Sequence, residues 1–225
     1  MKPFRPTRLG ALLLACAAAS ATLSACAPLL LGGAVGSALV AVDRRSSGAQ
    51  LDDQAIELRA GNRLTDQLGG RANVYVTSYN RQVLLTGEAA SEATRAEAER
   101  IVASVDNVRS TVNEIKVMNS PGLSQRTTDS LITGRVKAGF VDARDLPAVA
   151  IKVTTTHNVV YLMGRVTQKE ADRATEIARN TDGVQRVVRV LEILSEEELM
   201  RLAPAPAVQP AGTAPPATAP AAPRQ

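Results

Sequence analysis

The sequence predicts an α+β protein built from two tandem domains, each with the element order α-β-β-α-β. The first observation is an internal repeat, since VYVTSYNRQVLLTG at residues 74–87 aligns without a gap with IKVTTTHNVVYLMG at residues 151–164. The second observation is that helical apolar periodicity precedes and follows each copy, and that a third strand-like run closes it. Each domain is therefore expected to hold a three-stranded mixed sheet covered on one face by two helices.

The helices of the two copies correspond. First helices are expected from Asp52 and from Thr127. Ser91 and Thr167 are suitable N-cap residues for the second helices, because their side-chain oxygens can accept the free amide hydrogens of the first turn. Equivalent helices in both copies support a duplicated domain.

The strands correspond as well. A short polar turn, SYN in the first copy and THN in the second, joins the first two strands into a hairpin. Gly87 and Gly164 are expected to end the second strands, and Thr77 and Thr154 to lie in equivalent first strands. The offset between the copies is 77 residues at the strands (74 against 151) and 76 at the turns after the second helices (106 against 182). One insertion or deletion therefore separates the copies.

The domain boundaries follow from composition and from the repeat. The predicted parts are a lipoprotein signal peptide at 1–25, a lipidated tether at 26–51, a first domain at 52–118, a linker at 119–126, a second domain at 127–195 and a C-terminal part at 196–225. The last part is expected to hold a helix end and then a disordered tail, because proline and alanine dominate residues 203–225.

The N-terminus has the pattern of a secretory signal. Three cations precede an apolar run that is too short to span a bilayer. The run ends in LSAC at residues 23–26, which resembles a bacterial lipobox, so Cys26 is expected to carry the lipid anchor. Two alternatives stay open: ordinary cleavage that leaves a free Cys26, and a second lipobox-like LLAC that ends at Cys16. Ala27 follows Cys26 where an inner-membrane lipoprotein would have Asp, which by resemblance favours the periplasmic face of the outer membrane.

Charge and composition exclude several classes of function. Removal of the signal peptide takes three cations from 26 Lys and Arg against 22 Asp and Glu, so the mature chain is almost neutral. With three Tyr, two Phe and no Trp, the chain has too few aromatic rings to stack bases, and no nucleic-acid partner is expected. Neither a phosphate-binding glycine loop nor a nucleophile elbow is present, and the cysteines are used by the signal and the anchor. No catalytic residue, cofactor or metal is therefore expected.

The single histidine was the remaining candidate for chemistry. His157 lies in the predicted hairpin turn of the second copy, where the first copy has Asn80. We interpret it as a solvated turn residue, and the protein is expected not to be an enzyme.

The repeated motifs resemble the BON domain, which is named for bacterial outer-membrane and nodulation proteins. The resemblance rests on VLLTGEA and VYLMGRV and on the exits VDNV and TDGV, and it covers residues 52–195. Two such domains behind a lipobox resemble the dual-BON outer-membrane lipoproteins, in particular the division- and outer-membrane-stress-associated lipid-binding lipoproteins. This resemblance implies a non-enzymatic protein that binds anionic phospholipid and supports envelope integrity.

The second copy is the better candidate for an anionic surface. It has a net charge of +2 over residues 127–195, whereas residues 52–118 have −2. Its first helix has an apolar stripe opposite its core face, formed by Leu131, Gly134, Ala138 and Val141 and flanked by Arg135 and Lys137. An apolar ridge edged by cations is typical of interfacial helices. In the resembled family this helix contacts phospholipid and has a Trp at the position aligned with Leu131.

Two other interpretations remain open. The stripe could instead pack against the first domain. The protein could also be an adaptor that the anchor holds at the membrane while its domains bind outer-membrane assembly proteins.

Overall fold

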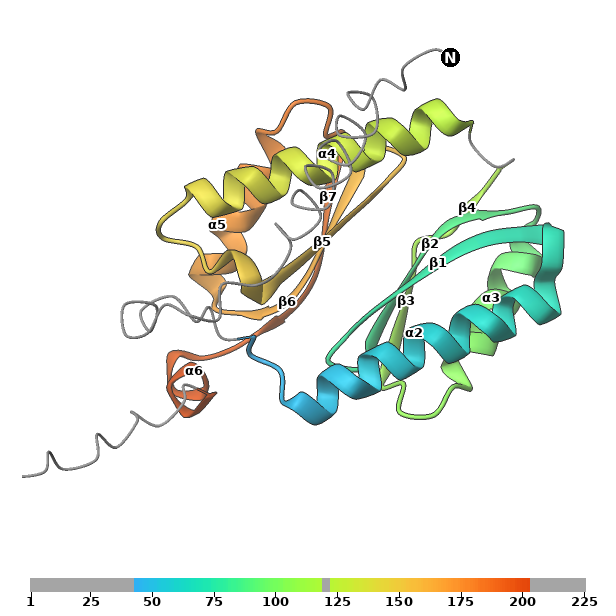
Figure 1. Ribbon diagram of the computed structural model, residues 1–225, viewed down its shortest axis with the longest axis horizontal. Coiled ribbons are helices and arrows are strands. Elements are labelled where there is room, and N and C mark those ends of the chain that lie inside the picture. Colours follow the sequence, from blue (N-terminus) through green and yellow to red (C-terminus); the bar gives the residue numbers. More distant parts are fainter. Residues whose placement is uncertain (1–42, 119–121, 203–225) are drawn as a thin grey trace, which may run out of the picture. The chain divides into compact units, whose positions relative to one another are not determined.

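The structure is a computed structural model that describes residues 43–118 and 122–202. The first domain consists of α2 (Ser47–Leu68), η2 (Gly69–Arg71), β1 (Ala72–Tyr79), β2 (Gln82–Ala89), α3 (Glu92–Ala103), β3 (Ser110–Asn113) and β4 (Lys116–Val117). The second consists of α4 (Leu123–Asp142), η3 (Ala148–Ala150), β5 (Ile151–Thr156), β6 (Val159–Val166), α5 (Gln168–Arg179) and β7 (Arg186–Ile193), followed by α6 (Glu196–Leu202). The predicted order α-β-β-α-β is confirmed in both domains (Figure 1). The signal peptide, Cys26 and the tail at 203–225 lie outside the described residues.

Both sheets are mixed, and the second strand of each domain is central. β1 pairs antiparallel with β2, which pairs parallel with β3 and β4. β5 pairs antiparallel with β6, which pairs parallel with β7. Thr77 lies opposite Leu84 and Thr154 lies opposite Tyr161, so the two hairpins have the same register at the predicted offset. The third strand is interrupted between β3 and β4 in the first domain and continuous in the second.

The first helices begin earlier than the sequence predicted. α2 starts at Ser47, within the predicted tether, because the Ser46 hydroxyl accepts the amide hydrogen of Ala49 at 3.1 Å and caps the helix. α4 starts at Leu123, within the predicted linker. The N-caps of the second helices are as predicted: Ser91 caps α3, and Thr167 forms a capping box with Glu170 at the start of α5.

The prediction that Gly87 and Gly164 end their strands is wrong. Each lies inside its strand, because β2 continues to Ala89 and β6 to Val166. A Cβ atom on Gly87 would lie 2.1 Å from the carbonyl oxygen of Asn73, and one on Gly164 would lie 2.4 Å from that of Ala150. Glycine is needed at both positions because the backbone of the neighbouring segment approaches too closely for any side chain.

Each sheet is apolar on both faces. One face packs under the two helices of its own domain, as predicted, around residues such as Ile56 in the first domain and Phe140 in the second. The other faces of the two sheets share a third apolar cluster formed by Tyr79, Leu84, Val159, Tyr161, Met163 and Val190. The domains therefore pack sheet to sheet, and the helices are left on the outer sides (Figure 1).

Candidate membrane-binding face of helix α4

Helix α4 has apolar residues on two opposite faces. Ile132, Val136 and Phe140 are at most 1% exposed and pack on the second sheet. The opposite face has Leu131 at 57% and Val141 at 73% exposure. Gly134 and Ala138 lie between them and are also exposed. The helical spacing of about 100° per residue thus places the four apolar stripe residues together on the solvent side.

The two predicted cations flank this stripe and are exposed. Among the described residues, the Arg135 guanidinium donates one long hydrogen bond, from Nη1 to the carbonyl oxygen of Asp182 at 3.4 Å. Within residues 43–118 and 122–202, Lys137 forms no hydrogen bond or ion pair. The acid Asp142 is exposed next to Val141 at the end of the helix, so the two cations of the stripe lie away from that end.

The stripe does not form the contact between the domains. That contact consists of the sheet-to-sheet cluster and of polar links around it. Lys152 Nζ lies 2.7 Å from Glu57 Oε1, and the Tyr79 hydroxyl donates to the carbonyl oxygen of Ala150 at 3.2 Å. α4 covers the opposite face of the second sheet, which leaves its outer stripe free of the first domain. The alternative in which the stripe packs against the first domain therefore has no support in the structure.

The corresponding face of α2 differs in shape and chemistry. It exposes Leu58 at 67%, beside Arg59 and Asn62, which are also exposed. Leu51, at 66% exposure, is a second exposed leucine, which was not predicted because the helix was expected to begin one residue after it.

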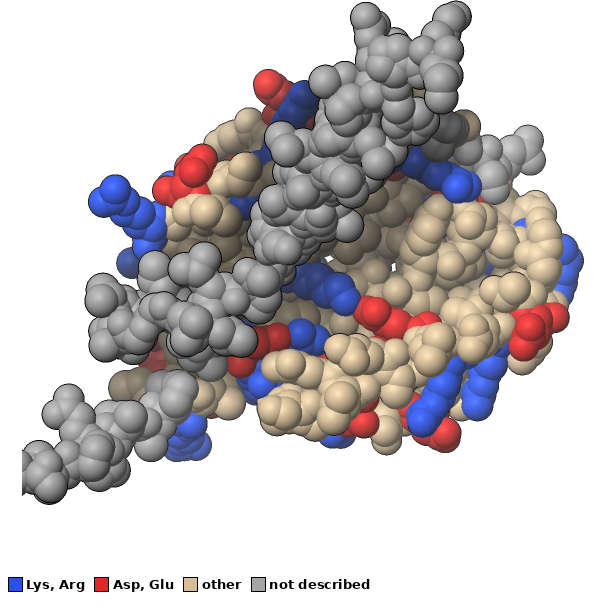
Figure 2. All heavy atoms as spheres, in the orientation of Figure 1, with Lys and Arg blue, Asp and Glu red and all other residues tan. Residues whose placement is uncertain are grey.

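In Figure 2, acidic and basic side chains are interspersed over the visible described surface, in keeping with the similar numbers of cations and acids in the chain.

His157 is not a solvated residue, which corrects the interpretation from sequence. It does lie in the turn, with φ of 51°, at the place that Asn80 has in the first domain. Its ring Nε2 lies 2.8 Å from Oε1 of Glu88 in β2 of the first domain, and the two side chains are 10% and 2% exposed. The second oxygen of Glu88 accepts a hydrogen bond from Asn73 Nδ2 at 2.9 Å. This largely buried pair joins the two domains, and no local sequence pattern predicts it, because the residues are 69 positions apart.

Two arginines before α2 connect the end of the tether to both domains. Arg44 donates from Nη1 and Nη2 to the two carboxylate oxygens of Glu170, at 2.6 and 2.8 Å, in the second domain. Arg45 donates to Asp53 at 2.8 Å, and its guanidinium lies 4.3 Å from the centre of the Tyr79 ring, in the first domain. Both arginines lie within the predicted tether, yet they bind the start of the folded part to both domains.

Neither a metal cluster nor a membrane-spanning helix is found in the described chain. Within residues 43–118 and 122–202, no three His, Cys, Asp or Glu side chains come together as metal ligands would. No helix in the same ranges combines the length and the apolarity that crossing a bilayer requires.

Comparison with known families identifies the repeated unit. The sequence profile of the BON domain matches residues 52–119 and 128–195, which are the two α-β-β-α-β units. The chain belongs to the BON-domain family. The stripe of α4 is thus on the first helix of the second BON domain.

Three curated relatives align with 62% to 76% of the chain. The chain is 35% identical to the 21 kDa hemolysin of Actinobacillus pleuropneumoniae over 152 residues, which are 67% of this chain and 78% of the relative. It is 33% identical to the outer membrane lipoprotein DolP of Haemophilus influenzae over 175 residues, 76% of this chain and 90% of the relative. It is 31% identical to the osmotically-inducible protein Y of Escherichia coli over 144 residues, 62% and 72% of the two chains. None of these names is that of an enzyme.

Proposed function

We propose that the protein is a lipid-anchored, non-enzymatic lipoprotein on the periplasmic face of the outer membrane. On this proposal it binds anionic phospholipid through α4 of the second BON domain and helps to maintain envelope integrity. The observation that carries the proposal is the exposed apolar ridge from Leu131 to Val141 with Arg135 and Lys137 at its sides. The similarity to an outer membrane lipoprotein over 90% of that relative supports the location.

Each part of the ridge has a physical task at the membrane. Leu131 and Val141 enter the boundary between headgroups and acyl chains, where their exposed surface leaves water. Gly134 and Ala138 between them are small, so the helix backbone comes close to the headgroups. Arg135 and Lys137 then reach lipid phosphates, each contributing about 1 kcal/mol near an anionic surface.

The anchor and the helix act together. A single acyl chain binds a membrane only marginally, whereas the two chains of a diacylated Cys26 give stable attachment. α4 adds a contact that depends on lipid charge. Cys26→Ser should therefore release the protein from the membrane fraction, and mass spectrometry of the mature wild type should find Cys26 as a diacylated N-terminus. A free thiol at Cys26, or a start elsewhere, would contradict the anchor.

The lipid contact is tested by co-sedimentation of residues 27–225 with phosphatidylglycerol-containing vesicles. Leu131→Glu should weaken binding by about ten-fold or more, because the lost burial of one leucine exceeds about 1.4 kcal/mol. Leu58→Glu on α2 is the matched control, since it makes the same change at 67% exposure in the first BON domain. Leu131→Trp should strengthen binding, because an amphipathic ring suits the headgroup level.

Circular dichroism and urea unfolding complete this experiment. Both Glu variants should unfold at the wild-type midpoint, since the changed side chains are exposed. If the wild type does not bind anionic vesicles, or if both variants lose binding equally, the lipid proposal fails. The adaptor for outer-membrane assembly proteins then becomes the leading interpretation.

A further inference from the structure

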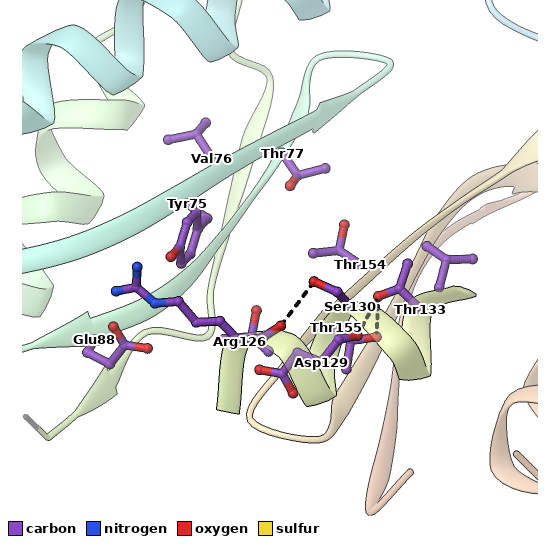
Figure 3. A pocket seen from close by; sticks show the side chains of 12 residues that line it. Tyr75, Val76, Thr77, Glu88, Arg126, Asp129, Ser130, Thr133, Thr154 and Thr155 are labelled. Atoms are coloured by element: carbon purple, nitrogen blue, oxygen red, sulfur yellow. Dashed lines mark hydrogen bonds between the residues drawn. The ribbon is translucent and has the colours of Figure 1, made fainter. Parts of the chain in front are cut away.

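A groove of about 410 Å³ opens between β1 of the first BON domain and α4 and β5 of the second (Figure 3). Its lining is mostly hydroxyl-bearing and small apolar side chains, with three charged residues. The lining residues are Tyr75, Val76, Thr77, Glu88, Arg126, Asp129, Ser130, Thr133, Val153, Thr154, Thr155 and Thr156. Four residues of α4 line the groove, and none of them belongs to the exposed ridge.

The groove runs along two strand edges. Residues 75–77 of β1 and residues 153–156 of β5 line it consecutively. Side chains of a strand alternate between its two faces, so consecutive residues border one groove only where the groove follows the edge of the strand. Within residues 43–118 and 122–202, β1 pairs only with β2 and β5 only with β6, so neither strand has a partner strand at its other edge.

The hairpin turns fix which backbone groups face the groove. Thr156 and Val159 flank the two-residue turn and therefore exchange hydrogen bonds with each other. Bonded and outward-facing residues alternate along an antiparallel strand, so the amide and carbonyl groups of Val153 and Thr155 point away from β6. Within the described residues, these outward amide and carbonyl groups form no hydrogen bond.

The equivalent edge in the first BON domain has one of its outward amides capped by a side chain. Ser78 has the place of Thr155, and its outward amide donates to Glu57 Oε1 at 2.8 Å. The residue at the position of Glu57 in α4 is Thr133, whose hydroxyl donates to the Thr155 hydroxyl at 2.8 Å and leaves the Thr155 amide without a partner. The Glu57 carboxylate thus binds an outward amide of β1, whereas the equivalent amide of β5 has no partner in the described chain.

Two of the three charged residues of the groove are already hydrogen-bonded within the protein, and the third is an exposed cation. Glu88 is engaged by His157 and Asn73, and Asp129 accepts the amide hydrogens of the hairpin turn. Arg126 is exposed, and Figure 3 shows its side chain extending along the groove toward Tyr75 and Glu88. An incoming acidic group would therefore find a positive charge at the mouth of the groove.

We propose that this groove binds an extended segment of a partner polypeptide, which adds as a strand to the free edge of β5 and places an acidic side chain beside Arg126. Main-chain hydrogen bonds to Val153 and Thr155 supply the affinity, as in other cases of strand addition. The small and β-branched lining selects small or β-branched side chains. This inference is independent of the lipid contact, since the two sites use different sides of α4.

A synthetic peptide tests the proposal on the full lipidated chain in detergent micelles. The probe is acetyl-EVTVTV-amide, and its matched control has N-methyl groups on alternate residues, which remove strand donors. Hydrogen exchange in the segment 151–156 should slow on the order of ten-fold with the probe and not with the control. Thr155→Pro should abolish the protection, because it removes the outward donor. Thr155→Val is the matched control, since it removes only the hydroxyl that accepts from Thr133, and it should retain the protection.

A charge exchange provides a second test that does not depend on the proline variant folding. Arg126→Glu should weaken binding of the EVTVTV probe and strengthen binding of the corresponding KVTVTV probe. Equal protection by the N-methylated control, no protection at millimolar peptide, or indifference to Arg126→Glu would each overturn the proposal. Faster exchange at 151–156 after removal of residues 203–225 would also overturn it, because the chain's own tail would then be the occupant.

Discussion

Asp129 in α4 repeats the position of Asp53 in α2: each carboxylate binds both amide hydrogens of the hairpin turn in its own domain. Asp53 accepts from the amides of Asn80 and Arg81 at 2.8 and 2.7 Å. Asp129 accepts from the two turn residues of the second domain, each at 2.9 Å. All four turn residues have positive φ, as a type I′ turn requires. A buried acid from the first helix therefore holds each hairpin against that helix.

Removal of either acid should destabilise its domain. Asp129→Ala leaves two amides without a partner and should lower the free energy of unfolding by about 2–3 kcal/mol. Asp53→Ala should cost more, because Asp53 also pairs with Arg45 and accepts from the Ser78 hydroxyl. Asp142→Ala, at an exposed site on α4, is the control and should stay within about 0.5 kcal/mol of wild type in urea unfolding. An Asp129 variant as stable as the control would refute this role.

The strand glycine Gly164 and the helix glycine Gly134 should respond in opposite directions to alanine. A Cβ atom at Gly164 meets the Ala150 carbonyl oxygen at 2.4 Å, so Gly164→Ala should cost about 2 kcal/mol or more. A Cβ atom at Gly134 meets nothing within 4 Å, so Gly134→Ala should add about 0.5–1 kcal/mol through helix propensity. Thermal and urea unfolding of both variants measure the difference, and equal effects would contradict the close approach at Gly164.

The ion pair between Arg44 and Glu170 should make the free energy of unfolding depend on pH below neutrality. Burial raises the pKa of Glu170, but hydrogen bonds from Arg44 and Thr167 outweigh it and lower the pKa below its usual value. The carboxylate thus stabilises the folded protein fully above the unfolded pKa of about 4.3, and this contribution is lost as pH falls through the lower folded value. Wild type and Glu170→Gln should therefore differ most near neutral pH, and the difference should shrink as the pH falls through the lowered pKa of folded Glu170. A gap that stays constant across urea unfolding from pH 3 to pH 7 would exclude this linkage.

The two cations beside the ridge should give the lipid contact its salt dependence. Arg135→Gln and Lys137→Gln should each weaken vesicle binding by about 1 kcal/mol at low salt, and the effect should fade near 1 M salt, where charges are screened within a few ångströms. Arg59→Gln is the matched control, because Arg59 is exposed at the equivalent position of α2. Co-sedimentation at several salt concentrations provides the measurement, and equal losses in all three variants would place the cationic contact elsewhere.

The sequence by itself determined the repeated unit, the register of both hairpins and the two faces of α4. These features depend on local patterns. Alternation along a strand, the spacing of Ile132, Val136 and Phe140, and N-cap residues such as Thr167 each act within a few positions of the chain. The helix starts were less well predicted, because Ser46 and residues 123–126 fit a helix as well as they fit a linker.

Only the tertiary structure decided what covers each apolar surface. Val83, Leu84 and Leu85 form one continuous apolar run, and nothing local shows that Leu84 faces the other domain. The pairing of His157 with Glu88 and the choice between ridge and interface for Leu131 depend on the same packing of sheet against sheet. The physical reason is that the sequence specifies the polarity and volume of each side chain. Which side chain it contacts depends on the distant segments that the fold brings close to it.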